Sequence, residues 1–227
     1  NKDLVFRRNN IEWFRLSGAS GNLITTSDAK INGITVGRGN GNIATNTTLG
    51  NQALNTNTTG INNIAIGKSS LFLNTTGQYN IAIGNSALYN NTNGRYNFAI
   101  GNEALTMNVS WSYNTAIGTW SLWNNISGAN NTAIGWSALN LNNSWIDNVA
   151  IGESSLLNNI SWYANTAIGN NALYSNSTGW TNTANGAESL FNNTTGINNT
   201  ALGYGTARGI TTWVANTILG ANITGLA

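Results

Sequence analysis

Four consecutive stretches of this chain share one pattern: IAIGKSSLFLNTTGQYN (64–80), IAIGNSALYNNTNGRYN (81–97), FAIGNEALTMNVSWSYN (98–114) and TAIGTWSLWNNISGANN (115–131). The period is 17 residues. It runs from residue 47 without insertion or deletion and gives ten full units and the start of an eleventh. Within the unit, the fourth place is always Gly, the last is always Asn, and the eighth is Leu in the first nine units. Such strict repetition indicates an architecture in which each unit packs against its neighbours.

A period of 17 residues is too short for a helical repeat, which needs about 33 residues or more. It fits one coil of an all-β, parallel β-solenoid (a β-roll), with one strand at places one to three and a second around places seven and eight. The third place is Ile or Leu in ten of eleven units, with Asn185 as the exception. We therefore expect two buried columns, one of Ile and one of Leu. Their central members are Ile117, Ile134, Ile151 and Ile168, and Leu122, Leu139, Leu156 and Leu173.

Stacked coils bring identical residues into register about 4.8 Å apart. The Asn columns can then form hydrogen-bonded amide ladders, and the Gly column indicates a positive φ or a close backbone approach. The second place of the strand is nearly always Ala, which predicts a flat outer surface that a monomer would leave uncovered. Three stacks around a common axis would bury this surface. The predicted trimer interface includes Ala116, Ala133, Ala150 and Ala167.

The composition excludes several function classes. The 227 residues contain 45 Asn and 26 Gly but no His, Cys or Pro, and only 7% are charged. Without His or Cys there is no thiolate or imidazole metal site, no Ser-His-Asp triad and no Cys nucleophile, and the acids are too sparse for a catalytic pair. The net charge of +2 is too weak for phosphate-driven nucleic-acid binding, and no apolar run is long enough to span a membrane. We expect no enzyme activity, metal or cofactor.

The charge distribution divides the chain. Residues 1–38 hold six of the nine bases. We expect an N-terminal β-hairpin module at 1–29, a lead-in at 30–46 and the β-roll at 47–227. The hairpin strands are the alternating runs Leu4–Arg8 and Ile11–Leu16. The bases of this module either contact a partner or form a solvated face, and we favour the solvated face. The chain begins at Asn1 without a visible signal peptide, as expected of a processed product or part of a longer chain.

The repeat resembles the NTAIG-type repeats of phage tail-fibre and virion-appendage proteins, and it is similar to the shorter AIG repeats in the heads of trimeric autotransporter adhesins. NTAIG occurs at 114–118, 131–135 and 165–169, and NTTG at 57–60, 74–77 and 193–196. The segments 3–26 and 31–54 resemble the short β-module and the lead-in of the same fibres. This resemblance implies a left-handed, parallel homotrimer at the virion surface, outside the cell, in contact with other virion or appendage proteins.

Trp residues are concentrated in the middle of the array, and four Trp residues replace Gly at the fourteenth place, which shows that this turn needs no positive φ. Exposed indoles suit the apolar faces of sugar rings, whereas the alternative is packing, ring on ring or between chains. The candidate glycan-binding residues are Trp111, Trp120, Trp123, Trp136, Trp145 and Trp162. The Asn at the eleventh place opens an Asn-x-Ser/Thr sequon in eight units, which we interpret as a turn motif rather than a glycosylation column.

Three function hypotheses follow. The first is a structural fibre of a virion, a trimeric shaft or arm that contributes to host attachment. The second is a surface adhesin, of a phage or a bacterium, that binds host glycans through exposed aromatic residues. The third is an ice-binding solenoid, but its Thr column is interrupted by Ile64, Ile81, Phe98 and Val149.

Overall fold

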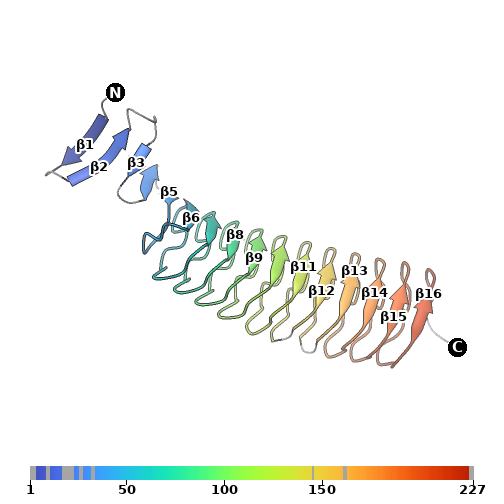
Figure 1. The fold of residues 1–227 in the computed structure, drawn as a ribbon. Helices are drawn as coiled ribbons and strands as arrows, with labels where there is room; N and C mark the ends of the chain where they lie inside the picture. The colour runs from blue at the N-terminus through green and yellow to red at the C-terminus, as the bar shows by residue number, and fades with distance from the viewer. Residues whose placement is uncertain are drawn as a thin grey trace.

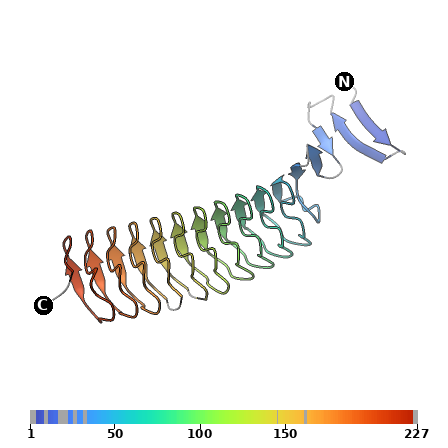
Figure 2. The same ribbon diagram turned by 180° about the vertical axis from the view of Figure 1, so that it is seen from behind.

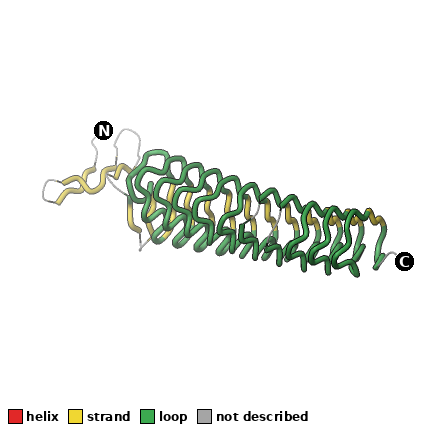
Figure 3. The backbone as a smooth tube through the Cα atoms, turned by 90° about the horizontal axis from the view of Figure 1, so that it is seen from below, coloured by secondary structure: helices red, strands yellow, loops and turns green. Residues whose placement is uncertain are grey.

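The computed structural model describes residues 4–8, 11–16, 23–25, 28–31, 34–144, 146–160 and 163–224. These residues form strands and turns, without helix (Figure 3). Figure 1 shows a rod of stacked coils with a small separate sheet beyond its N-terminal end. The view from behind shows the same order, with the termini at opposite ends (Figure 2). The predicted all-β, parallel β-solenoid is therefore confirmed.

The N-terminal sheet has three antiparallel strands. β1 (Leu4–Arg8) and β2 (Ile11–Leu16) form the predicted hairpin, with Leu4 opposite Leu16. The turn predicted between them lies outside the described residues. β3 (Leu23–Thr25), which the sequence did not predict, pairs with β2.

The second sheet has 13 strands and forms one side of the rod. β4 (Ala29–Ile31) and β5 (Ile34–Gly37) pair antiparallel, and β5 pairs antiparallel with β6 (Thr47–Gly50). From β6 onward every pair is parallel, and each strand is paired with the residues 17 positions away. These strands are β7 (Ile64–Ile66), β8 (Ile81–Ile83), β9 (Phe98–Ile100), β10 (Thr115–Ile117), β11 (Thr132–Ile134), β12 (Val149–Ile151), β13 (Thr166–Ile168), β14 (Thr183–Asn185), β15 (Thr200–Leu202) and β16 (Thr217–Leu219). We number the coils from 1 (residues 47–63) to 11 (from residue 217), and the places in each coil from 1 to 17.

The second side of each coil is a succession of turns rather than the strand that we predicted. Its residues at places 6 and 8 have left-handed φ angles, for example 52° at Ser137 and 50° at Leu139. Its backbone still bonds to both neighbouring coils: the Ser137 amide donates to the Thr119 carbonyl (3.0 Å) and the Leu139 amide donates to the Ser155 carbonyl (3.0 Å). A left-handed φ costs roughly 1–2 kcal/mol per non-Gly residue, and burial of the Leu side chain, about 1.5–3 kcal/mol, offsets it.

The core consists of Leu at place 8 and small residues opposite it. Leu139, Ala133 (place 2) and Ala138 (place 7) are fully buried, as are their counterparts in neighbouring coils. The predicted Leu column, Leu122, Leu139, Leu156 and Leu173, is therefore confirmed.

The predicted Ile column was wrong. Ile117 and Ile134 are partly exposed, and Ile151 and Ile168 are 36% and 37% exposed on the outer side of the sheet. The reason is steric. The Leu side chain fills the narrow space between the two sides of the coil, and the strand that faces it has room only for Ala.

Two buried Asn ladders run along the rod, as predicted. At place 11, the Asn91 side-chain amide donates to Asn74 Oδ1 (2.8 Å). At place 17, Asn80 Oδ1 accepts the backbone N–H of Asn97 (3.0 Å), and Asn97 Nδ2 donates to the Trp111 carbonyl (2.8 Å). The ladders therefore satisfy buried backbone groups as well as one another, which is needed in so polar a core.

The Gly column at place 4 has both predicted causes. Its φ angles lie between 122° and 156°. A Cβ on Gly135 would lie 2.6 Å from the carbonyl C and O of Gly152 in the next coil. Only Gly allows the coils to approach this closely.

Candidate functional site

The outer side of the parallel sheet is a regular surface that runs along the rod. Places 1 and 3 of every strand point outward, because place 2 points into the core. Place 1 is apolar in coils 2 to 4 and mostly Thr in the other coils, whereas place 3 is Ile or Leu in every coil except coil 9, which has Asn185. We call this surface the sheet face. It comprises Ile64, Ile66, Ile81, Ile83, Phe98, Ile100, Thr115, Ile117, Thr132, Ile134, Val149, Ile151, Thr166, Ile168, Thr183, Asn185, Thr200, Leu202, Thr217 and Leu219. A parallel sheet is normally covered on both sides, and this one is covered on its inner side alone.

The predicted interface residues lie on the other side of the strands. Ala116, Ala133, Ala150 and Ala167 are fully buried within a single chain. They cannot contact a second chain, so this assignment was wrong. A large side chain at one of them, as in Ala116→Trp, would disturb the folding of its own coil before it disturbed any assembly.

The structure divides the candidate glycan-binding Trp residues between two regions around the coil. Trp120 and Trp136 lie on the turn after the strand, at places 6 and 5 of successive coils, and Trp123 follows at place 9. Trp120 and Trp136 are 38% and 47% exposed, and their rings meet edge to face with centroids 5.8 Å apart. Trp111 lies at place 14 and is 41% exposed, without a left-handed φ. Trp145 and Trp162 lie outside the described residues.

Stacked aromatic ladders were not predicted beyond the Trp residues. Tyr79, Tyr96 and Tyr113, all at place 16, form one stack with centroid distances of 4.9 and 5.1 Å and almost parallel planes. Phe72 stacks on Tyr89, and Tyr174 on Phe191, at place 9. The signal was available, since aromatic residues 17 positions apart must stack if the coils are in register.

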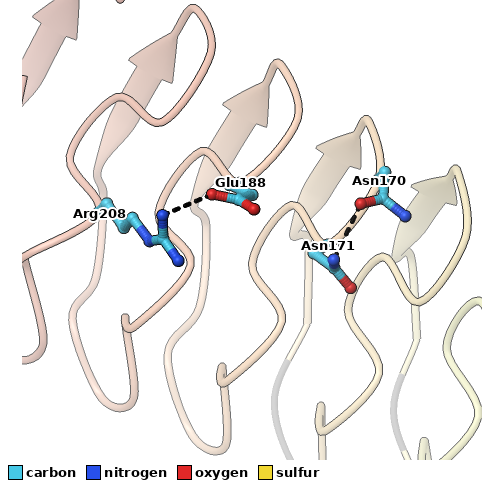
Figure 4. A network of polar contacts seen from close by, with 4 residues as sticks. All are labelled: Asn170, Asn171, Glu188 and Arg208. Atoms are coloured by element: carbon cyan, nitrogen blue, oxygen red, sulfur yellow. Dashed lines mark hydrogen bonds and ion pairs between the residues drawn. The ribbon is translucent and has the colours of Figure 1, made fainter. Parts of the chain in front are cut away.

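Charged groups are few along the coils, and two of the acids have defined partners. Glu188 forms an ion pair with Arg208 (Oε2 to Nη1, 2.7 Å), and the Arg208 guanidinium lies 5.2 Å from the centre of the Phe191 ring. Figure 4 shows this pair on the outside of the coils, next to the side-chain hydrogen bond between Asn171 and Asn170. Glu103 Oε2 accepts a hydrogen bond from Trp123 Nε1 (3.2 Å).

The sequon column at place 11 is inside the rod. Asn74, Asn108 and Asn176, like the other sequon Asn residues, are 0–1% exposed. The Asn176 amide nitrogen donates to Asn159 Oδ1 (2.9 Å) and to the Gly179 carbonyl (2.8 Å). These amides have no room for a glycan in the folded chain.

The described part of the chain has no group of three Asp or Glu side chains that could hold a metal ion. Nor does it include a helix that could cross a membrane. No protein-family model, curated protein or solved structure matches the chain. The features that bear on function are the sheet face, the exposed aromatic residues and the few charges.

Proposed function

We propose that this chain is a structural fibre protein of a virion appendage, a phage tail fibre or arm, that assembles as a parallel homotrimer at the virion surface. The sheet face carries the proposal. Its place 3 column is Ile or Leu in all coils but one, it runs the length of the rod, and its residues lie in straight columns such as Ile83, Ile100, Ile117 and Ile134. An exposed apolar surface of this extent marks an association site. The resemblance of the NTAIG repeats to tail-fibre repeats supports the same assignment.

The geometry of the columns is compatible with a closed cyclic assembly, and the resemblance to trimeric fibres favours three chains. Each sheet face presents two columns, at places 1 and 3, and closed cyclic symmetry lets one column of each chain pack against the other column of the next. A symmetry axis parallel to the rod also keeps all coils in register, so that Ile134 of each chain lies at the same height. The trimer would bury the Ile residues, and not the Ala residues that we first assigned to the interface.

Mass and a charge substitution test this assembly. Sedimentation equilibrium should give three times the 24.0 kDa chain mass. Ile117→Asp and Ile134→Asp should produce monomers, because each trimer would bury three unpaired carboxylates. Ser110→Asp adds the same charge at an exposed position away from the sheet face and should leave the trimer intact. A wild-type monomer would refute the trimer, and trimeric Ile117→Asp would refute this interface.

A second candidate function is adhesion to host glycans, and the exposed indoles favour it. Trp111, Trp120 and Trp136 are each more than a third exposed, and the stacked Tyr79, Tyr96 and Tyr113 are exposed to a similar or greater extent. Quenching of Trp fluorescence by host polysaccharide, lost in Trp136→Ala, would support adhesion. Neither function requires catalysis, a metal or a cofactor.

A further inference from the structure

An Asn that precedes Gly can react with its own backbone. The amide nitrogen of the Gly attacks Cγ of the Asn, a five-membered succinimide ring closes, and the side-chain nitrogen leaves as ammonia together with the proton of the Gly amide. Water then opens the ring at one of its two carbonyls, which gives aspartate or isoaspartate. Gly favours ring closure because no Cβ stands beside the attacking nitrogen. The chain contains four Asn-Gly pairs, which begin at Asn32, Asn40, Asn93 and Asn185.

The pair at Asn185 is exposed, but its attacking nitrogen is held by the sheet. The Gly186 amide, directly after β14, donates to the Ile168 carbonyl at the end of β13 (2.8 Å). Ring closure would first have to break this hydrogen bond between neighbouring strands. Exposure of the Asn side chain is therefore not sufficient for the reaction. The pair at Asn32 lies outside the described residues.

The pair at Asn40 combines an exposed side chain with an available nitrogen. Asn40 and Gly41 are both exposed. Among the described residues, none accepts a hydrogen bond from the Gly41 N–H and none bonds to the Asn40 side-chain amide. Asn93 is also exposed, but Gly94 is buried, so a base from the solvent has less access to its N–H. The structure therefore ranks Asn40 as the most reactive of the three described pairs.

Asn40 lies where the lead-in meets the first coil. Its backbone amide donates to the Leu54 carbonyl (3.1 Å), and its carbonyl accepts the side-chain amide of Asn57 (3.5 Å). Asn57 begins the buried ladder at place 11, so Asn40 covers the N-terminal end of that ladder. Gly41 packs closely on the same coil, since an added Cβ would lie 2.9 Å from the Asn57 carbonyl oxygen. Residues 40 and 41 thus help to dock the lead-in on coil 1.

Isoaspartate would change the length of the chain at this contact. Its backbone runs through the former side chain, which adds one methylene group, about 1.5 Å, between the amide of residue 40 and Gly41. The hydrogen bond to Leu54 on one side and the close contact of Gly41 on the other leave little room for this addition. Aspartate, the other product, carries the same charge but keeps the original chain length. The two products should therefore differ in their effect on the junction.

We propose that Asn40 is a site of spontaneous conversion to isoaspartate, and that this modification loosens the docking of the lead-in on coil 1. The reaction consumes only water and releases ammonia. Residues 40 and 41 lie outside the sheet face, and the proposal depends neither on the trimer nor on glycan binding.

Incubation of the folded protein at mildly alkaline pH, followed by peptide mapping with mass spectrometry, tests the site. Labelling by an isoaspartyl methyltransferase distinguishes isoaspartate from aspartate. We expect Asn40 to convert at least about ten-fold faster than Asn185, because the Gly186 amide must first give up its hydrogen bond, and Asn93 to fall between them. In denaturant the three rates should become similar, because the local sequence alone then decides. Equal rates in the folded protein, or an Asn40 that reacts only in denaturant, would overturn the assignment.

Hydrogen exchange of the aged protein tests the effect on the junction. Segment 39–46 should exchange faster in the isoaspartate form, while coils 5 to 10 stay unchanged. Asn40→Gln keeps a neutral amide but would have to close a six-membered ring, so it should neither convert nor lose protection on ageing. Freshly prepared Asn40→Asp has the charge without the added methylene and should keep its protection. An isoaspartate form that exchanges like the unmodified chain, or an equal loss in Asn40→Asp, would overturn the proposed loosening.

Discussion

Gly135→Ala is the smallest substitution that should damage this fold severely. The new Cβ would lie 2.6 Å from the carbonyl C and O of Gly152, about 0.8 Å short of ordinary contact. If the two coils moved apart by this 0.8 Å, the hydrogen bond from the Gly152 amide to the Ile134 carbonyl would lengthen from 2.8 Å to about 3.6 Å, beyond the usual range. The lost bond costs about 1 kcal/mol, and the φ of 136° adds about 1–3 kcal/mol of strain for a side chain. We expect roughly 3 kcal/mol of destabilisation, or a melting temperature lower by about 6 °C or more.

Thermal unfolding followed by circular dichroism measures this effect, with Gly205→Ser as the matched control. Gly205 also has a positive φ (60°), but it lies at place 6, where Ser137 adopts 52°. The nearest atom to its added Cβ is Asn222 Oδ1, the end of a side chain. Gly205→Ser should therefore change the melting temperature little, or raise it by restricting the unfolded chain. A Gly135→Ala melting temperature within about 2 °C of wild type, or an equal loss in Gly205→Ser, would refute the close-approach argument.

Four further substitutions test the assignment of inside and outside by chemical denaturation. Leu139→Ala should lower the free energy of unfolding by about 2–5 kcal/mol because it opens a cavity in the core. Ile134→Ala should lower it by less than about 1 kcal/mol in the unassociated chain. The reverse order would contradict the buried Leu column. Asn97→Leu should cost roughly 3 kcal/mol or more, because it leaves the buried backbone N–H of Asn114 without its acceptor and removes one of the two amide donors to the Trp111 carbonyl. A neutral effect would show that the ladder is dispensable. Tyr96→Asn should change the free energy of unfolding by less than about 1 kcal/mol, because the loss of two ring stacks is offset by the lower cost of the left-handed φ of 55° for Asn than for Tyr. A loss above about 3 kcal/mol would mean that the Tyr stack stabilises the coil.

The coil, its period and the Leu column were predictable because the repeats within this one chain can be compared with one another, as related sequences would be. Seventeen residues leave room for one short strand, turns and little else. The fixed Gly and Asn places identified the close approach and the ladders. The conformation of the second side was not predictable, because left-handed φ angles at Leu139 and its counterparts contradict the usual preference of Leu and are imposed by coil closure.

The candidate sites were predicted less well, for a geometric reason. Sequence places along a coil do not reveal how far apart two side chains lie around it. Trp111 and Trp120 are close in sequence, yet they lie on different turns of the coil, at places 14 and 6. The contact between Glu103 and Trp123 depends on the offset of 20 residues, which becomes visible only when adjacent coils are superposed.

The inward orientation of the Ala residues at place 2 could have been inferred from how little this place varies between coils, rather than from the small size of Ala. Place 2 is Ala in nine consecutive coils, from Ala65 to Ala201, while place 1 ranges over Thr, Ile, Val and Phe. A surface free of steric limits tolerates such a range, and a confined position does not. Asn185 in the Ile column gives the same indication, because a lone amide in a buried apolar column would lack a hydrogen-bond partner. The Ile column nevertheless stays apolar over the other coils without a partner inside the chain. Its regularity therefore supports a partner outside the chain, and a second and third copy meet the requirement that the covering surface repeat every 17 residues.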